Sequence, residues 1–594
     1  MTAAGLLAAF ATPLLVAVLA PTLCAALLPS RKAAAIVPAL AGAAALPALL
    51  FALLSSGQPA LQIDWVLFGV RMALDDTGRV FLIASATLWL CAGWYARGYL
   101  QGDRRCGAFF GFFLVAQAGN YALILAQDIA SFYLGFATMT FAAYGLVVHD
   151  RTAEALRAGL VYIAMALLGE AMLIASFVII AATAQTADLA IASAAIAHSP
   201  NRDLIVALLI AGFGVKAGVP LLHMWLPLAH PVAPTPASAV LSGAIIKAGL
   251  LGWLRFLPLG QAPIEWGGVL VVAGVIAMFG AVIAGVAQRD SKTALAYSSV
   301  SQMGYLMVAV GAGLLVPQAW PLLLPAAAMY ALHHGLSKGA LFLGVGVLRA
   351  QCVPRRAGML GMLLPAAALA GAPLTSGVLA KDWLKHGLAA LESEWGAWLV
   401  ATLGIAAMAT TLIMARVIAL ALREYGSATH GHDHGDSGGG EPGAGTGRDD
   451  GGAASWGLLA PWLVLLAAVA VSSWLAPAWI ALEVPPAWEW AAIWSSVWPI
   501  GGGLLIAVLG ATALRRRAFV IPAGDVLAPL ETVLRPLARG AGNVLRLLDV
   551  RYEFSAPPAL ARASRVEAGI SAWRTAGIAV LLLLAAFVAA LALG

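Results

Sequence analysis

The chain has 594 residues, of which 62% are hydrophobic and 10% are charged, and its formal net charge is +6. Soluble domains contain about 45–50% apolar and about 25% charged residues, so this composition excludes a soluble globular enzyme. The apolar residues run in blocks and do not alternate, which argues against a transmembrane barrel and predicts an all-α polytopic membrane protein.

Segments of about 20 apolar residues, which are long enough to cross a bilayer, recur along the whole chain. About sixteen spans are predicted, and the first is expected to be retained and not cleaved as a signal peptide. They lie near 5–28, 33–55, 76–96, 107–126, 129–148, 158–183, 203–222, 236–256, 265–287, 293–314, 320–347, 358–384, 396–421, 456–476, 498–514 and 574–593.

Lysine and arginine are concentrated in the loops that follow the odd-numbered spans and in the stretch 518–574. Together these segments hold 24 of the 34 basic residues. Because basic residues mark cytoplasmic loops, these segments are predicted to be cytoplasmic, in the inner (plasma) membrane of a cell. Both termini are then expected on the outer side. The same rule explains the positive net charge, so no nucleic-acid partner is predicted.

Two polar segments interrupt the series of spans. Residues 426–455 are a low-complexity loop, expected to be flexible and cytoplasmic, and a tolerated polar insertion is the favoured interpretation. Its weak candidate metal ligands are His430, His432 and His434. Residues 515–573 mix Leu and Val with spaced Arg, which predicts an interfacial amphipathic segment before a final anchor helix at 574–594. The amphipathic segment would serve as a surface linker or as a brace against neighbouring subunits.

The cysteines and the absence of long soluble stretches predict that this chain binds no cofactor. The four cysteines are far apart and form no CxxC pair: Cys24, Cys91, Cys106 and Cys352. They indicate neither a disulfide framework nor an iron–sulfur or zinc-thiolate site. No long soluble domain is visible that would hold a flavin or a nucleotide.

Five basic residues lie inside predicted spans, where a charge is costly and therefore predicts a function. They are Lys216, Lys247, Lys338, Lys381 and Arg416. Pro220 follows Lys216 by four residues and is expected to break its helix. Pro373 weakens the helix just before Lys381 and Asp382. A broken helix beside a lysine is typical of ion sites at the membrane midplane.

Two histidines share a predicted span with Lys338. His333 and His334 precede it, and His334 shares a helix face with Lys338 because the two are four residues apart. Histidine titrates near neutral pH, so such a row can pass protons. The alternative is a hydrogen-bonded packing cluster.

A broken helix with a lysine, followed by a helix with a central cation, occurs twice along the chain. The cation pairs are Lys216 with Lys247 and Lys381 with Arg416, which are 31 and 35 residues apart. Two structural repeats of five spans each are therefore predicted, at 107–256 and 265–421. An odd number of spans per repeat forces opposite orientations, so the repeats are expected to be inverted. Further helices lie at 1–106 and 456–514.

Glu170 is the one carboxylate deep inside a predicted span. A lone carboxyl group in an apolar environment stays neutral unless a cation lies nearby. Lys216, on the following predicted span, is the natural candidate for that cation.

Four runs in the middle of the chain carry a family resemblance. The first is KAGVPLLHMWLPLAHPVAPTPASAVLSGAIIKAGLLGWLRF (216–256). The others are QRDSKTALAYSSVSQMGYLMVAVG (288–311), YALHHGLSKGALFLGVGVL (330–348) and LAGAPLTSGVLAKDWL (369–384). Together they resemble the antiporter-like membrane subunits of respiratory complex I, of formate hydrogenlyase and hydrogenase-4, and of the Mrp-type sodium/proton antiporters. The resemblance covers roughly 70–421, and LPLAHPVAP favours the hydrogenase-4 branch.

The resemblance implies a role for each matching residue. Lys216 matches the lysine of the first broken helix, and Lys247 matches the connecting lysine of the next helix. His334 and Lys338 match the central hydrophilic axis. Lys381, with Asp382, matches the terminal lysine of the second broken helix. Protons would enter one half-channel, hop along this axis and leave by the other.

The match fails at one functional position. Relatives usually carry a glutamate in the fifth helix, where the stretch 128–144 of this chain has Ala137. The first half-channel is then altered or inactive, or its carboxylate has moved. Glu170 matches a position where some family members carry an aspartate, so we expect it to be the substitute partner of Lys216.

Four functions remain open from the sequence. The preferred one is a proton-translocating subunit of a multi-subunit energy-converting complex, driven by a quinone oxidoreductase or hydrogenase arm on other chains. The alternatives are an Mrp-type Na⁺/H⁺ antiporter subunit, a cation-coupled membrane partner of a zinc-dependent CO₂-hydrating protein for bicarbonate accumulation, and a non-conducting scaffold. The expected partners are other membrane subunits, the lipid bilayer and a peripheral cytoplasmic arm. The transported ion is expected to be H⁺, with Na⁺ left open.

Overall fold

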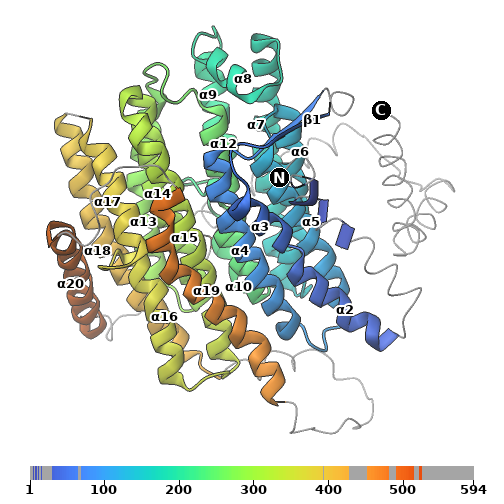
Figure 1. Ribbon diagram of the computed structural model, residues 1–594. Helices are drawn as coiled ribbons and strands as arrows, with labels where there is room; N and C mark the ends of the chain where they lie inside the picture. Colours follow the sequence, from blue (N-terminus) through green and yellow to red (C-terminus); the bar gives the residue numbers. More distant parts are fainter. Residues whose placement is uncertain are drawn as a thin grey trace, which may run out of the picture.

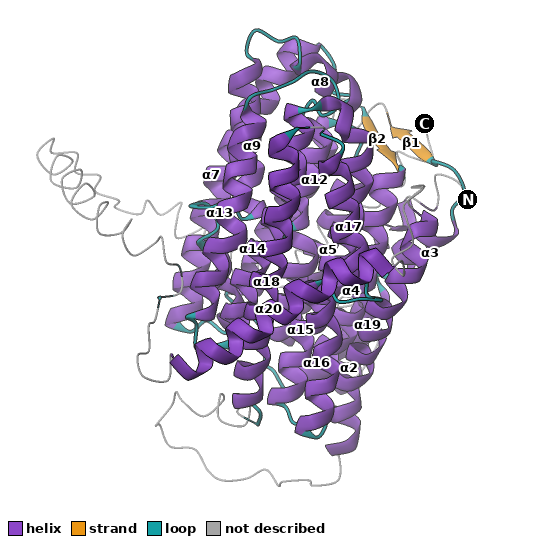
Figure 2. Cartoon of the chain, turned by 90° about the vertical axis from the view of Figure 1, so that its left-hand side faces the viewer, coloured by secondary structure: helices purple, strands orange, loops and turns teal. Residues whose placement is uncertain are grey.

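The computed structural model describes residues 30–63, 69–391, 393–426, 451–479 and 490–513, together with a few positions in 5–16 and at 521, 522 and 524. This part of the chain folds into an elongated bundle of helices with a small β-hairpin at one end (Figures 1 and 2). Ten of its helical segments are long and apolar enough to cross a membrane. The protein is therefore a multi-pass helical membrane protein, and the total of sixteen spans stays a prediction.

Most helices begin and end within a few residues of the predicted spans, although the predicted span 33–55 consists of two short helices. In chain order the helices are α2 (Ser30–Ala43), α3 (Leu46–Leu54), α4 (Asp76–Tyr99), α5 (Cys106–Leu125), α6 (Ile129–Val147), α7 (Ala153–Ala184), α8 (Leu189–Ile196), α9 (Arg202–Ala217), α10 (Trp225–Val232), α11 (Thr235–Val240), the π-helix η1 (Leu241–Ile245), α12 (Lys247–Phe256), α13 (Trp266–Val286), α14 (Ser291–Leu315), the 3₁₀-helix η2 (Pro317–Ala319), α15 (Trp320–Arg349), α16 (Arg355–Ala370), α17 (Ser376–Ala389), α18 (Glu394–Arg423), α19 (Gly451–Trp479) and α20 (Trp490–Ala513).

Acidic residues at the ends of predicted spans cap the helices that follow them. Asp75 accepts a hydrogen bond from the Gly78 backbone nitrogen at 2.6 Å, at the start of α4. Asp128 does the same at the start of α6, where the Ser131 nitrogen lies 2.7 Å away. These carboxylates satisfy N–H groups of the first turn, which have no partner within the helix.

The two ends of the bundle differ in charge. Strands β1 (Ala60–Ile63) and β2 (Val70–Ala73) pair antiparallel at what we call the hairpin end, where Arg255 forms an ion pair with Asp75. The turns after α4, α6, α13, α15 and α18 lie at the opposite end, which we call the arginine-rich end. Its basic residues include Arg97, Arg104, Arg105, Arg151, Arg289, Arg349, Arg355, Arg356 and Arg423. The location of this end in the cytoplasm stays a prediction.

Two predicted spans are interrupted in the structure. The predicted span 203–222 ends early, because α9 stops at Ala217 and the chain turns before α10 begins. The predicted span 358–384 is not one helix but two, α16 and α17. Both helices that end at these turns close with a glycine in the left-handed conformation, at φ values of 80° for Gly218 and 86° for Gly371. This conformation costs glycine little, so each helix ends where the glycine stands.

The two turns share more than their glycines. A proline stands two residues after each glycine, and a leucine with positive φ follows it. These residues are Pro220 with Leu221 (φ 73°) and Pro373 with Leu374 (φ 64°). Proline has no backbone N–H, which prevents the helix from resuming at once.

Helices α14 and α15 run through the middle of the molecule. Every residue of α14 from Ser291 to Leu314 is buried. Helix α13 packs closely along α14, where a Cβ atom added to Gly274 would lie 2.6 Å from the Gly304 carbonyl oxygen. Helix α20 lies at the outer edge beside α18, and α19 packs on α4 and α15 (Figure 1). Polar side chains on α14 and α15 are therefore remote from the periphery of the bundle.

Several predicted features lie outside the described residues. They are most of the first span 5–28, residues 427–450 of the low-complexity loop with His430, His432 and His434, almost all of the segment 515–573, and the final helix 574–594. The sequence predicted that residues 451–455 belong to that loop, but they form the start of α19.

Candidate functional site

Six buried cationic or titratable side chains lie along the middle of the bundle, and we call them the central row. They are Lys216, Lys247, His334, Lys338, His333 and Lys381, and each is at most 4% exposed. Lys247, Lys338 and His333 lie close enough to His334 to influence it electrostatically. Lys381 and Lys247 influence His333 in the same way. Lys216 is connected to this row because α9 packs closely on α12. A Cβ atom added to Gly249 of α12 would lie 2.6 Å from the Ala217 nitrogen of α9.

Lys216 lies in the last turn of α9, at the first helix break. Its ammonium donates a hydrogen bond to the Tyr162 hydroxyl at 3.1 Å, and that hydroxyl donates to the Thr140 carbonyl at 2.9 Å. The ammonium also lies over the ring of Tyr162, 4.9 Å from its centroid, and 5.6 Å from that of Trp225. A lysine at the C-terminus of a helix is favoured by the helix dipole, and aromatic faces stabilise it further.

Glu170 lies on α7, which packs against α9, and its side chain is buried. Glu170 and Lys216 lie close enough to influence each other electrostatically, and their predicted functional pairing stays a prediction. The carboxylate also faces the Tyr133 hydroxyl on α6, although neither of its oxygens lies within 3.5 Å of a well-aligned donor among the described residues. The ammonium of Lys216 binds Tyr162 instead, one more side chain of α7. The two groups are thus brought to neighbouring helices without a direct ion pair.

Ala137, which stands where relatives carry a glutamate, is half-buried on α6. The preceding residue, Phe136, turns its ring toward Lys216, with 5.8 Å between the ring centroid and the ammonium nitrogen. An aromatic face on α6 therefore contributes to the environment of the lysine where a carboxylate was expected.

Lys247 begins α12, directly after a π-helical turn. Its ammonium donates to the Ser242 carbonyl at 2.6 Å, and the Ser242 hydroxyl lies 2.7 Å from that of Ser299 on α14. The π-helical turn displaces backbone carbonyls from their usual partners, and such turns occur often at functional sites. Sequence reasoning placed Lys247 at the centre of a span but did not predict this turn, because a π-helix has no propensity signature.

His334 and Lys338 lie at the centre of α15. Lys338 donates to the Leu295 carbonyl at 2.8 Å and to the Ser298 hydroxyl, both on α14. Neither ring nitrogen of His334 has a hydrogen-bond partner among the described residues. Buried polar groups without a protein partner are usually satisfied by water. A row of such groups is suited to passing protons through bound water.

His333 connects the row to the second helix break. Its Nδ1 lies 2.9 Å from the hydroxyl of Ser376, the first residue of α17. Lys381, further along α17, donates to the Ala370 carbonyl at the end of α16, at 3.0 Å, and lies over the Tyr305 ring at 5.2 Å. The ammonium thus occupies the negative end of the α16 dipole.

Two predicted site residues have their polar partners outside the central row. Asp382 pairs with Lys385 at 3.1 Å and is one-quarter exposed, although its charge also influences its neighbour Lys381. Arg416 donates to the Gln288 carbonyl at 2.7 Å, at the arginine-rich end. Sequence spacing places residues on a helix but does not say which face of a packed bundle they meet.

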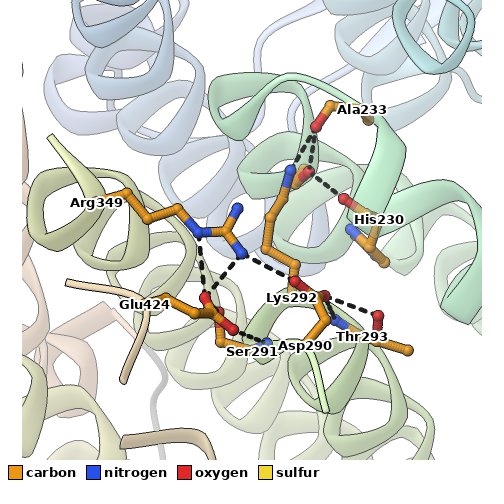
Figure 3. Close-up of polar contacts among 9 residues, drawn as sticks. His230, Ala233, Asp290, Ser291, Lys292, Thr293, Arg349 and Glu424 are labelled. Carbon is orange, nitrogen blue, oxygen red and sulfur yellow. Dashed lines mark hydrogen bonds and ion pairs between the residues drawn. The ribbon is translucent and has the colours of Figure 1, made fainter. Parts of the chain in front are cut away.

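Two buried residues of the same region were missed from the sequence. His230 on α10 is fully buried between the charges of Lys292, Lys338 and Lys247. Lys292 had been assigned to a cytoplasmic loop, but it is the second residue of α14, is 2% exposed and donates to the Ala233 carbonyl (Figure 3). His230 lies in the run LPLAHPVAP, so its place in a family motif could have identified it as a candidate site residue.

A cluster of ion pairs lies next to Lys292 at the arginine-rich end (Figure 3). The Arg349 guanidinium binds Asp290 and Glu424, each at 2.8 Å. Burial raises the pKa of Asp290, but Arg349 and hydrogen bonds from Thr293 outweigh burial and hold that pKa below its usual value. Asp290 is therefore ionised at neutral pH. The cluster joins the ends of α14, α15 and α18.

Among the described residues no three His, Cys, Asp or Glu side chains gather as a metal site would require. Cys91 and Cys106 are free thiols.

Comparison with known proteins identifies the family. Residues 126–409 match the family described as NADH:quinone oxidoreductase/Mrp antiporter, TM. The chain is 30% identical over 379 residues to NADH-quinone oxidoreductase subunit N of Desulforudis audaxviator, covering 59% of this chain and 72% of that protein. It is 29% identical over 341 residues to hydrogenase-4 component B of Escherichia coli, covering 55% of this chain and 50% of that protein.

The fold agrees with that assignment. A chain in the structure of the Mrp complex from Dietzia sp. superposes with a TM-score of 0.69 at 22% identity, covering 96% of this chain and 63% of that one. At such low identity the likeness concerns the fold alone. The chain spans about half the length of the hydrogenase component that it matches. From the match to residues 126–409 and the subunit N relative, the chain belongs to the NADH:quinone oxidoreductase/Mrp antiporter family of transmembrane proteins.

Proposed function

We propose that this chain is a proton-translocating subunit of a multi-subunit energy-converting complex, in which protons move along the central row. The observation that carries the proposal is the row itself, which links two helix breaks through α12 and α15. Burying such a row in a membrane protein costs free energy, which indicates that the row has a function such as ion transport. Glu170 would load Lys216, and His334 with Lys338 would relay protons toward Lys381.

The two helix breaks would belong to two inverted five-helix repeats, 107–256 and 265–421, each forming one half-channel. The common turn of glycine, proline and positive-φ leucine supports this proposal. The two broken helices also run in opposite directions, because α9 starts near the hairpin end and α16 starts at the arginine-rich end. Lys216 precedes its turn, whereas Lys381 follows its own.

The driving force would come from other chains. We propose a redox arm of quinone oxidoreductase or hydrogenase type at the arginine-rich end, with that end cytoplasmic, both termini outside and no cofactor on this chain. The likeness to subunit N and to hydrogenase-4 component B supports this choice. The fold likeness to the Mrp complex supports one second candidate, a Na⁺/H⁺ antiporter subunit.

Metal analysis of the complex purified from its native membrane in mild detergent decides between these functions. Because a redox arm needs iron–sulfur clusters, we expect stoichiometric iron, with or without nickel, by elemental mass spectrometry. Zinc alone would contradict the redox-driven function and support CO₂ hydration. A complex without metal would instead support an antiporter or a scaffold.

The role of Glu170 is tested by comparing two variants in liposomes that contain the complex. Glu170→Gln and Lys216→Ala are both expected to reduce proton transport by about tenfold or more, because loading of the lysine needs a nearby carboxylate. Ser176→Ala serves as the control for loss of a polar group, because Ser176 is a buried residue of α7 whose hydroxyl donates to the Leu173 carbonyl at 2.7 Å. The pairing is wrong if Glu170→Gln transports normally while Lys216→Ala is inactive.

A further inference from the structure

A second line of polar groups leaves the central row at Lys338 and runs toward the arginine-rich end. Its first member, His230, is fully buried on α10 and stacks on Phe342 of α15, with 4.7 Å between ring centroids and 21° between ring planes. Phe342 lies one helical turn beyond Lys338. Neither ring nitrogen of His230 has a hydrogen-bond partner among the described residues.

Lys292 is the next member of this line. Its ammonium donates to the Ala233 carbonyl, which ends α10 one turn after His230 (Figure 3). A lysine at the carbonyl end of a helix is stabilised by the helix dipole. Four charged groups influence this ammonium electrostatically, namely Arg349, Asp290, Asp150 and Glu424. A buried ammonium is thus set between a buried imidazole and a partly exposed ion-pair cluster.

The cluster closes the outer end of this line. Arg349 binds Glu424 through two nitrogens, at 2.8 and 3.1 Å, and binds Asp290 at 2.8 Å. Ser291 donates its backbone N–H to the same glutamate at 2.8 Å. The side chains of Arg349 and Glu424 are 23% and 17% exposed, and that of Asp290 is 37% exposed, so the cluster reaches the surface. The guanidinium of Arg349 therefore holds together the partly exposed cluster beside Lys292.

We propose that His230 and Lys292 form a side branch for protons between Lys338 and the arginine-rich end, and that Arg349 holds this branch closed. The proposal rests on the proposed proton transport along the central row. The Arg349 guanidinium binds both carboxylates at the mouth and offsets the negative charge that would otherwise attract a proton there. The same guanidinium occupies oxygens of Asp290 and Glu424 that would otherwise accept a proton beside Lys292. Water would bridge His230 to its neighbours, since its ring nitrogens have no described protein partner.

Passive proton conductance of the whole complex in liposomes tests the branch. A potassium-diffusion potential drives protons inward, and a dye inside the vesicles reports the pH. Arg349→Gln removes the positive charge and leaves two carboxylates at the mouth, so we expect conductance to rise by about threefold or more. Arg423→Gln, an exposed arginine beside Glu424, is the matched control and is expected to change nothing.

Double variants identify the path. Adding Lys292→Met, or separately His230→Leu, to Arg349→Gln is expected to return the conductance to the wild-type level. If conductance stays raised in both double variants, protons pass by another route. If Arg349→Gln leaves conductance unchanged, Arg349 does not close the branch. Either result overturns the proposal. Arg349→Met, with the same expected result, is used if Arg349→Gln does not assemble.

These failures are distinct from failure of the proposed function. Proton transport by the wild-type complex under its own driving force is measured in the same vesicles. A wild-type complex that moves no protons contradicts the proposed function. A wild-type complex that moves protons, with Arg349 variants that do not leak, contradicts only the branch.

Discussion

Replacing Lys381 with methionine is expected to reduce proton transport by about tenfold or more while the complex still assembles. Methionine has a similar length but carries no proton, so the last ammonium of the central row is lost. In the native protein this ammonium binds the Ala370 carbonyl at 3.0 Å and lies over the Tyr305 ring. Burying a charge costs free energy and methionine removes that cost, so a loss of transport by an assembled complex would report function. Dye-based proton uptake by vesicles is the measurement.

His386→Met is the matched control for this variant. His386 lies further along α17 than Lys381, and its side chain is exposed. Substitutions at exposed positions usually have small effects, so transport is expected to stay within about twofold of wild type. If Lys381→Met transports as well as His386→Met, the row does not need Lys381, and a scaffold would be supported.

Gly377→Ala is expected to be the most damaging small substitution in the described part of the chain. A Cβ at this position would lie 1.6 Å from the Ala368 carbonyl oxygen and 3.1 Å from Cε1 of His333. The end of α16 would have to move away from α17, which separates His333 from Ser376 and Lys381 from its carbonyl. We expect a destabilisation of about 3 kcal/mol or more, the upper range for overpacking a buried site. Thermal unfolding in detergent, followed by size-exclusion chromatography, measures the shift in Tm.

Gly280→Ala provides the comparison for the same chemical change. Gly280 lies on the outer face of α13, and an added Cβ would have no heavy atom within 4 Å. Because alanine favours helices over glycine by about 1 kcal/mol, this variant is expected to be neutral or slightly more stable. If both variants unfold at the same temperature, the close contact between α16 and α17 is not a constraint on the fold.

The positions of the spans and of the costly charges followed from the sequence, because both are set by local chemistry. A run of apolar residues satisfies its backbone only as a helix, and α4 and α6 begin at the capping residues Asp75 and Asp128. A lysine within such a run is conspicuous, which is how Lys216 and Lys381 were found. The family resemblance also followed from local runs, and the comparisons confirmed it.

The partners of those charges depended on the packing of helices that are distant in the sequence. Lys216 binds Tyr162 where Glu170 was expected, and Asp382 turns to Lys385. Lys292 has the sequence context of a loop residue and becomes a buried cation because the end of α10 lies against the start of α14. The sequence by itself determined that the chain crosses a membrane and carries buried lysines, because the cost of a charge in an apolar run depends only on its neighbours along the chain. Only the tertiary structure decided which groups these lysines meet, because a hydrogen bond depends on distances of about 3 Å that the packing of whole helices sets.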